Sequence, residues 1–212
     1  HPNFYSDAMQ LAAYHESADT LSAIVVTPQQ IYNEFSSGSQ DISALRDFVK
    51  MFYDRATIPS EFPQYLLMYG DGSYDPKKRF GSNTNFIPTY QSDNSTVLTS
   101  SYVSDDFYGL LDDVEGVWAA GDAIDIGIGR FPVKNANESS VLLNKVLDYN
   151  KTGFNPSTTN NGCSNLASTS PFGDWRNIVC FIGDDEDGGL HQSDANKLAT
   201  MVDTAANDYN VD

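Results

Sequence analysis

Basic residues are scarce in this chain of 212 residues, which has 12 Lys and Arg against 29 Asp and Glu and a formal net charge of −17. A nucleic-acid interface needs Lys and Arg to neutralise phosphates, and here the overall charge has the opposite sign. The composition therefore excludes nucleic-acid binding as a function class. It is typical of a highly soluble protein, and it also suits binding of divalent cations or basic partners.

Long apolar runs are lacking as well. No stretch approaches the ~20 apolar residues that a membrane-spanning helix requires. The first residues have no basic head followed by an apolar run, so the chain shows no signal peptide. With only two cysteines, Cys163 and Cys180, a single disulfide could form, and one candidate disulfide does not fix the compartment.

The chain is also poor in groups for hydrolytic catalysis, which needs a nucleophile, a base and a group that orients the base. Of the three histidines, only His191 lies beside a plausible cleft. Cys180 is predicted to be buried in an apolar strand, and Cys163 lies in a connector without a cationic neighbour to lower its pKa. The chain alone is therefore predicted to lack a workable hydrolase site.

What is present is enough apolar material for a core, since 40% of the residues are hydrophobic and 12 Tyr and 12 Phe are among them. Apolar spacing predicts helices and short apolar runs predict buried strands, and their alternation indicates a mostly parallel α/β sheet. The expected helices are 6–15, 28–35, 41–55, 137–150 and 193–206, and the expected strands are 22–27, 64–69, 125–132 and 177–183. Residues 22–69 then form a parallel βαβ unit, and residues 73–122 form a long irregular stretch.

A connector rich in Gly, Ser, Thr and Asn divides the chain at residues 151–174. The pattern of strand and helix restarts after it. We therefore expect a first subdomain over residues 1–150, a linker over 151–174 and the beginning of a second subdomain over 175–212.

An acidic loop, Asp184 to Gly189, follows the last predicted strand, where open parallel sheets place ligand and catalytic groups. The carboxylates of Asp184, Asp185 and Asp187 are hard oxygen ligands that suit Ca²⁺, although the EF-hand spacing is absent. A solvated loop without a metal is the alternative. No cofactor is required by any other feature.

Three further acidic stretches have more ordinary explanations. Gly70-Asp71-Gly72 follows a predicted strand without the Lys of a phosphate loop, which favours a tight turn. The remaining two stretches are Asp105–Asp106 and Asp112–Asp113. Their side chains could cap nearby backbone N–H groups, bind cations or position loops, and capping is the favoured interpretation.

Five runs together resemble the gingipain-like cysteine peptidases of the C25 family, and among these the sortase of the type IX secretion system of Bacteroidetes. They are residues 26–38 (VTPQQIYNEFSSG), 65–72 (YLLMYGDG), 125–133 (DIGIGRFPV), 173–177 (GDWRN) and 184–188 (DDEDG). They occur in this order over nearly the whole chain.

The resemblance implies a caspase-like, three-layer α/β/α fold in two subdomains. Residues 1–150 would be the non-catalytic subdomain, and residues 175–212 would begin the catalytic one. The family's catalytic His, in a Gly-His-Gly motif, and its nucleophilic Cys would both lie beyond Asp212. The acidic member of the triad would lie among Asp184, Asp185 and Glu186, with Glu186 as the candidate and Asp185 as its alternative, and Asp194 is the counterpart of a substrate-selecting Asp.

By the same resemblance, the parent enzyme would be an endopeptidase at the cell surface, associated with the outer membrane. It would cleave the C-terminal sorting signal of secreted proteins and transfer the new end to a surface glycolipid. Its partners would be those proteins and the rest of its own peptidase domain, and this chain alone would be inactive. The alternative is a non-catalytic, cation-stabilised binding domain with a peptidase-like fold.

Overall fold

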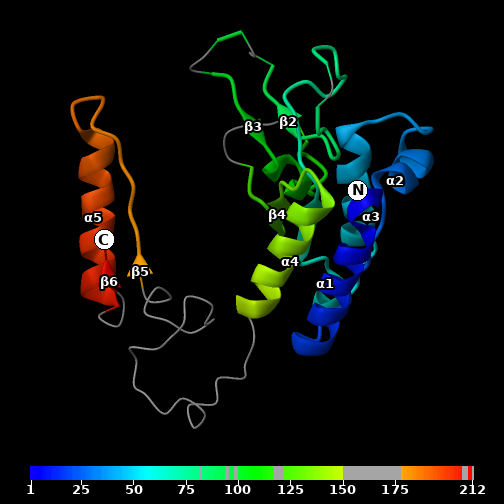
Figure 1. Cartoon of the computed structure of the whole chain (residues 1–212), viewed down its shortest axis with the longest axis horizontal. Helices are drawn as coiled ribbons and strands as arrows, with labels where there is room; N and C mark the ends of the chain where they lie inside the picture. The colour runs from blue at the N-terminus through cyan, green and yellow to red at the C-terminus, as the bar shows by residue number, and fades with distance from the viewer. Residues whose placement is uncertain are drawn as a thin grey trace. The chain divides into compact units, whose positions relative to one another are not determined.

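The computed structural model describes residues 1–81, 83–93, 96–97, 100–116, 122–149, 178–206 and 210–211. The chain divides into two compact units, His1–Leu147 and Asp148–Asp212, drawn in blue to yellow and in orange to red in Figure 1. The predicted connector 151–174 lies outside the described residues. The predicted subdomain boundaries at 150 and 175 stay a prediction.

Three α-helices open the first unit, α1 (Tyr5–Ala18), α2 (Pro28–Phe35) and α3 (Ile42–Arg55), with a short 3₁₀ turn, η1 (Pro2–Phe4), before them. α2 begins with a capping box, because the Gln30 N–H donates to Thr27 Oγ1 and the Thr27 N–H donates to Gln30 Oε1. At α3, the Asp41 carboxylate accepts from the Ser43 N–H at 2.8 Å. The three predicted helices are confirmed.

The strand predicted at residues 22–27 is wrong. This segment pairs with no strand among the described residues. Helix side chains accept from its backbone instead, since the Ala23 N–H donates to Glu16 Oε1 and the Thr27 N–H donates to Gln30 Oε1. Only part of the apolar run is inward, with Val26 against the core and Ile24 64% exposed. The predicted βαβ unit over residues 22–69 is therefore not formed.

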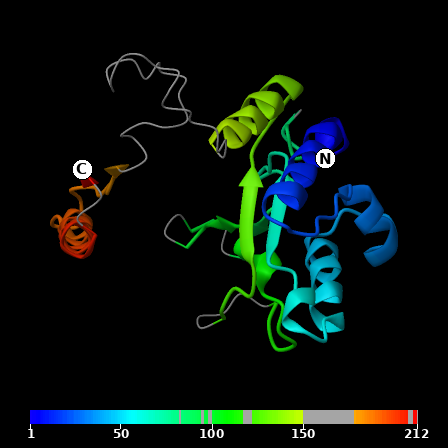
Figure 2. The same cartoon turned by 90° about the horizontal axis from the view of Figure 1, so that it is seen from below.

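The parallel pair at the centre of the unit is β1 (Tyr65–Tyr69) with β4 (Gly127–Phe131). Tyr65 lies opposite Gly127, and Tyr69 lies opposite Phe131. A Cβ at Gly127 would lie 2.8 Å from the ring of Tyr65, so the glycine allows this aromatic to rest on β4. Figure 2 shows the two strands running side by side.

The described residues of the stretch 73–122, predicted to be irregular, form only short elements. β2 (Tyr90–Gln91) pairs antiparallel with β3 (Val103–Ser104), and a 3₁₀ turn, η3 (Asp106–Gly109), follows. A further 3₁₀ turn, η2 (Pro59–Glu61), precedes β1. This stretch nevertheless supplies much of the core, namely Ile87, Phe107, Tyr108, Leu110 and Leu111.

Helix α4 (Ala136–Tyr149) follows β4 and begins as the sequence predicts. The Glu138 N–H donates to Asn135 Oδ1 at 3.0 Å, and the Asn135 side chain donates back to Glu138 Oε1 at 2.6 Å. These reciprocal bonds stabilise the first turn of the helix.

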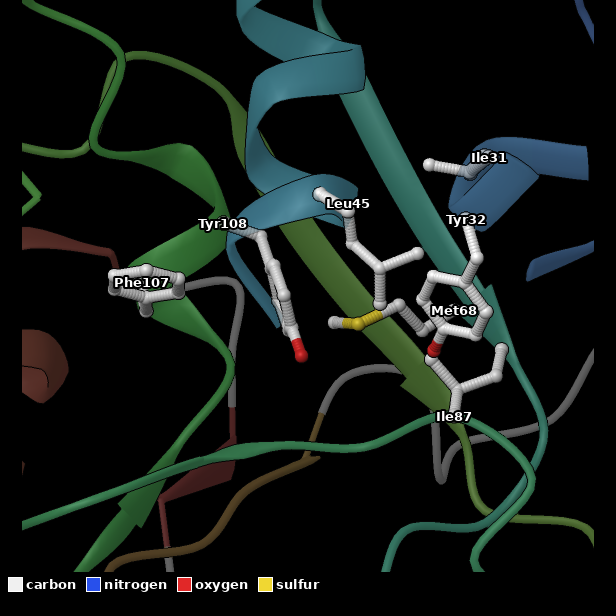
Figure 3. Packing of buried hydrophobic residues seen from close by; sticks show 8 residues of the cluster. Ile31, Tyr32, Leu45, Met68, Ile87, Phe107 and Tyr108 are labelled. Carbon is white, nitrogen blue, oxygen red and sulfur yellow. The ribbon is translucent and has the colours of Figure 1, made fainter. Parts of the chain in front are cut away.

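Helices cover both faces of the β1–β4 pair. On one face, η1, α1 and α4 pack on Tyr69 and Phe131 through buried Phe4, Leu11 and Leu143, respectively. On the other face, α2, α3 and η3 enclose Met68, and Figure 3 shows Tyr108, Leu45 and Met68 converging there. A third cluster of Val49, Leu111 and Ile126 continues this layer. The arrangement is helix, sheet, helix, as expected for a three-layer α/β fold.

The described part of the second unit is a parallel βαβ unit. β5 (Ile178–Val179) leads through α5 (Leu190–Ala205) to β6 (Asn210–Val211), which pairs parallel with β5. Two of the three strand pairs of the structure are parallel, so the predicted α/β class is confirmed. Among the described helices, none combines the length and the apolar character needed to cross a bilayer.

Candidate functional site

The candidate site is the acidic loop between β5 and α5, at the carboxyl end of a parallel strand. Gly183 fixes how this loop leaves the strand. A Cβ at Gly183 would lie 2.8 Å from the carbonyl oxygen of His191 and 3.0 Å from backbone atoms of Gln192. Only a residue without a side chain fits there, because the obstacles are backbone atoms of α5. The close approach brings the loop against the first turn of the helix.

That approach places Asp184 beside His191. The Nδ1 atom of His191 lies 2.9 Å from Asp184 Oδ1. A carboxylate only accepts, so Nδ1 carries the proton, and Nε2 faces away from this bond. Both side chains are more than half exposed, at 54% and 60%. The sequence indicated His191 and Asp184 separately and did not predict that they pair. Gly183, which lets the loop approach α5, is the residue in the sequence that could have indicated the pairing.

The other carboxylates of the loop are oriented by a tight turn. The Gly189 N–H donates to the carbonyl of Glu186 at 2.9 Å, and Asp187, Gly188 and Gly189 have positive φ angles of 49°, 71° and 76°. Glu186 and Asp185 are exposed, and neither side chain forms a hydrogen bond with another residue in the described ranges. They are therefore free to accept from an approaching donor.

Asp194, the predicted substrate-selecting residue, lies on the first part of α5. Its Oδ1 atom accepts from Lys197 Nζ at 2.9 Å, and its side chain is 55% exposed. A shallow hollow of about 500 Å³ lies along the same helix, lined by Gly188, Gly189, Gln192, Ser193, Asn196, Lys197 and Thr200. Polar side chains and two glycines line it, so it offers hydrogen-bond partners to a ligand.

The predicted cation ligands, Asp184, Asp185 and Asp187, do not converge on a common point. Asp184 turns to His191, and no group of three His, Cys, Asp or Glu side chains within the described ranges could hold a metal ion. The calcium site stays a prediction.

Cys180 is exposed, which corrects the prediction that it is buried. The physical reason is that the described part of its own unit leaves this segment uncovered, since Ile178 inside β5 is also exposed, at 44%. Cys163 lies outside the described residues.

A second strand end, after β1, is a structural turn, as the sequence favours. Gly70 has a φ of 147°, and its N–H donates to the carbonyl of Phe131 at 2.9 Å. The carbonyl of Asp71 accepts from the N–H groups of Phe86 and Ile87, and its carboxylate accepts from the Thr84 hydroxyl. These bonds join the turn to β4 and to residues 84–87, as expected for a structural turn.

The role of Asp105 differs from the favoured capping. Its two carboxylate oxygens accept from Arg130 Nε at 2.6 Å and from Nη2 at 2.8 Å. Arg130 also donates to the carbonyls of Gly70, Ile87 and Pro88. It thereby ties η3, β1 and the segment before β2 to β4. Sequence reasoning missed this pair because 25 residues separate its members.

The family model for peptidase family C25 matches residues 1–212. The chain belongs to this family. Among solved structures, the dimeric latent PorU of Porphyromonas gingivalis is similar, with 36% identity and a TM-score of 0.59. The match covers 70% of this chain and 15% of the PorU chain. No curated protein sequence matches at a significant level.

Membership in C25 confirms the resemblance read from the sequence, and the likeness to PorU supports the predicted caspase-like α/β fold. Membership in this family also gives a comparison for the residues around the acidic loop. A C25 peptidase is a cysteine peptidase, and the described residues bring His191 to Asp184 rather than to a cysteine.

Proposed function

We propose that this chain is the first subdomain and the opening βαβ unit of a gingipain-like cysteine endopeptidase, a sortase of the type IX secretion system. In this proposal the whole enzyme stands at the cell surface and removes the C-terminal sorting signal of secreted proteins. The match to the C25 model over residues 1–212 is the observation that carries the proposal, and the likeness to PorU supports it.

Within this enzyme, the loop after β5 supplies the acidic residue that orients the catalytic histidine. Asp184 is already occupied by His191, whereas Asp185 and Glu186 are exposed and unpaired among the described residues. This difference favours Glu186 and Asp185 over Asp184, and the family resemblance makes Glu186 the candidate and Asp185 its alternative. A carboxylate hydrogen-bonded to the imidazole fixes its tautomer and stabilises the imidazolium that forms during the reaction.

The chain alone does not hydrolyse peptides under this proposal. None of its three histidines stands between glycines, since the neighbours of His191 are Leu190 and Gln192. Within the second unit, His191 donates to the Asp184 carboxylate, and the exposed Cys180 forms no bond with a basic side chain in the described ranges. The sorting-signal protein and the remaining peptidase domain are the partners that the proposal requires.

The test compares two proteins on one substrate, a secreted protein carrying its C-terminal sorting signal, with cleavage followed by mass spectrometry. The 212-residue chain should give no product, and a longer protein that adds the Gly-His-Gly segment and the strand-end cysteine should cleave. In that longer protein, Glu186→Gln should lower kcat by a factor on the order of 10²–10⁴, and the neighbouring Asp187→Asn should leave it within about twofold. Turnover by the short chain that is lost in Cys180→Ala would overturn the proposal.

A further inference from the structure

The first unit of this acidic chain carries a basic loop. Lys77, Lys78 and Arg79 are consecutive and exposed, in a chain with only 12 basic residues. Phe80 follows them with 82% of its surface exposed, and Tyr74 precedes them with 76% exposed. Three cations and two aromatic rings are thus presented within seven positions.

The loop is held in shape from inside. Asp75 is 6% exposed; its carboxylate accepts from the Phe80 N–H at 3.0 Å, and its carbonyl accepts from the Lys78 N–H at 3.1 Å and from Asn83 Nδ2 at 2.8 Å. Hydrogen bonds from the backbone N–H groups of Arg79 and Phe80 hold the pKa of Asp75 below its usual value of 3.8. The carboxylate therefore stays ionised, and its hydrogen bonds persist near neutral pH.

The base of the loop is anchored to the rest of the unit. The carbonyl of Pro76 accepts from Gln40 Nε2 at 3.2 Å and from Asn85 Nδ2 at 3.3 Å. Asn85 is 6% exposed and also accepts from the Ser73 N–H. The anchoring bonds come from outside the basic triplet, so the three cationic heads and the Phe80 ring take no part in holding the loop.

The three cations also lack the partners that most others have. None of Lys77, Lys78 and Arg79 forms an ion pair with a residue in the described ranges. Most other described cations do pair with a carboxylate, namely Arg46, Lys50, Arg130, Lys134 and Lys197. The net charge of −17 supplies many carboxylates. The charge of Arg79 helps to lower the pKa of Asp75, but no carboxylate in the described ranges forms an ion pair with any of the three cations. An arrangement of this kind is suited to an external anion.

We propose that the basic loop, residues 74–80, binds an acidic segment of another polypeptide. The three cations complement carboxylates spaced along an extended chain, and the rings of Tyr74 and Phe80 offer flat apolar contact to its backbone and side chains. A polypeptide segment fits better than a membrane, because a segment contacts the loop alone, whereas an anionic bilayer also repels the rest of a chain of charge −17. The inference stands apart from the proposed catalytic function.

The test measures binding of a short fluorescein-labelled poly-Glu peptide to the 212-residue chain by fluorescence anisotropy, with a poly-Gln peptide as the uncharged probe. The triple variant Lys77→Gln, Lys78→Gln, Arg79→Gln should weaken poly-Glu binding by roughly tenfold or more. Binding to the wild type should fall between about 0.05 M and 0.3 M salt, and the residual binding of the variant should change little. Phe80→Ser should cost roughly two- to fivefold without changing the salt effect.

The matched control removes three cations elsewhere on the first unit, in the variant Arg55→Gln, Lys134→Gln, Lys145→Gln, which has the same net charge as the loop variant. Its affinity for poly-Glu should stay within about twofold of the wild type. Equal weakening by both triple variants would show an effect of overall charge and overturn the proposal. Loop-dependent binding to phosphatidylglycerol vesicles without binding to poly-Glu would overturn it in favour of a membrane surface.

Discussion

The two units of the chain differ in what their helices do with apolar side chains. In the first unit, three clusters of buried residues lie between the helices and the β1–β4 pair. In the second unit, none of the 16 residues of α5 is buried. Leu190, Leu198 and Met201 are 54%, 52% and 65% exposed, although they stand at helical spacing.

The same local pattern, apolar residues at helical spacing, therefore leads to burial in the first unit and to exposure in the described part of the second. The first unit encloses a core because helices cover both faces of its sheet. In the described part of the second unit, α5 has an apolar side that its own βαβ unit does not cover. Burial of a Leu or Met side chain stabilises by about 1.5–3 kcal/mol, so this side gains from contact with further polypeptide. A peptidase domain that continues the sheet would supply such contact.

The largest contrast is expected between two leucines. Leu111 is fully buried and Leu198 is 52% exposed. Leu111→Ala should lower the free energy of unfolding by about 3–5 kcal/mol, because it leaves a cavity in the third cluster. Leu198→Ala should change it by less than about 0.5 kcal/mol. Urea unfolding followed by circular dichroism measures both, and equal losses would show that α5 is packed in a core of its own.

A smaller contrast is expected between two aspartates that each bind a cationic or histidine side chain. Asp105 and Arg130 have side chains 21% and 13% exposed, and Asp184 and His191 are more than half exposed. Asp105→Ala leaves a mostly buried guanidinium without its carboxylate and should cost about 2–4 kcal/mol. For Asp184→Ala we expect less than about 1 kcal/mol in the same urea experiment. A reversal of this order would contradict the assignment of Arg130 as the link between elements.

Helix capping gives a contrast of about 1 kcal/mol. Thr27 caps α2 in a reciprocal box with Gln30, so Thr27→Ala should destabilise the first unit by about that amount. The matched change is Thr200→Ala on α5, whose hydroxyl bonds only the carbonyl of Asn196 one turn earlier. That variant should be neutral to within about 0.5 kcal/mol, since alanine is the better helix former. Thermal unfolding of the two variants beside the wild type provides the measurement.

The smallest expected effect is a change in how much stability the protein loses in acid, and it concerns Asp75. Its pKa is lowered in the folded chain, so its contribution to stability is present above its usual value of 3.8 and is lost as the pH falls below it. Asp75→Asn should therefore reduce the loss of stability between about pH 5 and pH 2. Asp194→Asn, on the exposed α5, is the control and should follow the wild type. The midpoints of urea unfolding, measured across this pH range, provide the test. Identical acid profiles for Asp75→Asn and the wild type would refute the role of the loop hydrogen bonds.

Periodicity predicted the helices well and the strands less well. Helices α2, α3 and α4 begin within one residue of the predicted starts at 28, 41 and 137. The capping bonds that fix these starts join residues three positions apart or fewer. Residues 22–27 have the composition of a strand and still pair with none in the described ranges. A strand exists only when another strand lies beside it, and the apolar run carries no information on its neighbour.

The candidate site was also predicted only in part from the sequence. The sequence located the acidic loop at the end of a strand, and the structure confirms that position. It did not show that Asp184 alone would be engaged, because that depends on the close packing of Gly183 against the backbone of α5. Nor did it reveal that Asp105 and Arg130 would meet, since a long irregular stretch lies between them.

The sequence by itself determined the charge, the existence of the helices, the α/β class and, through its ordered motifs, the family. Tertiary structure alone decided which strand pairs with which, which aspartate binds Arg130, and which apolar helix side is covered. The physical reason is range. Caps and periodicity arise from contacts within a few residues of one another, whereas sheet pairing and burial depend on residues that only folding brings together.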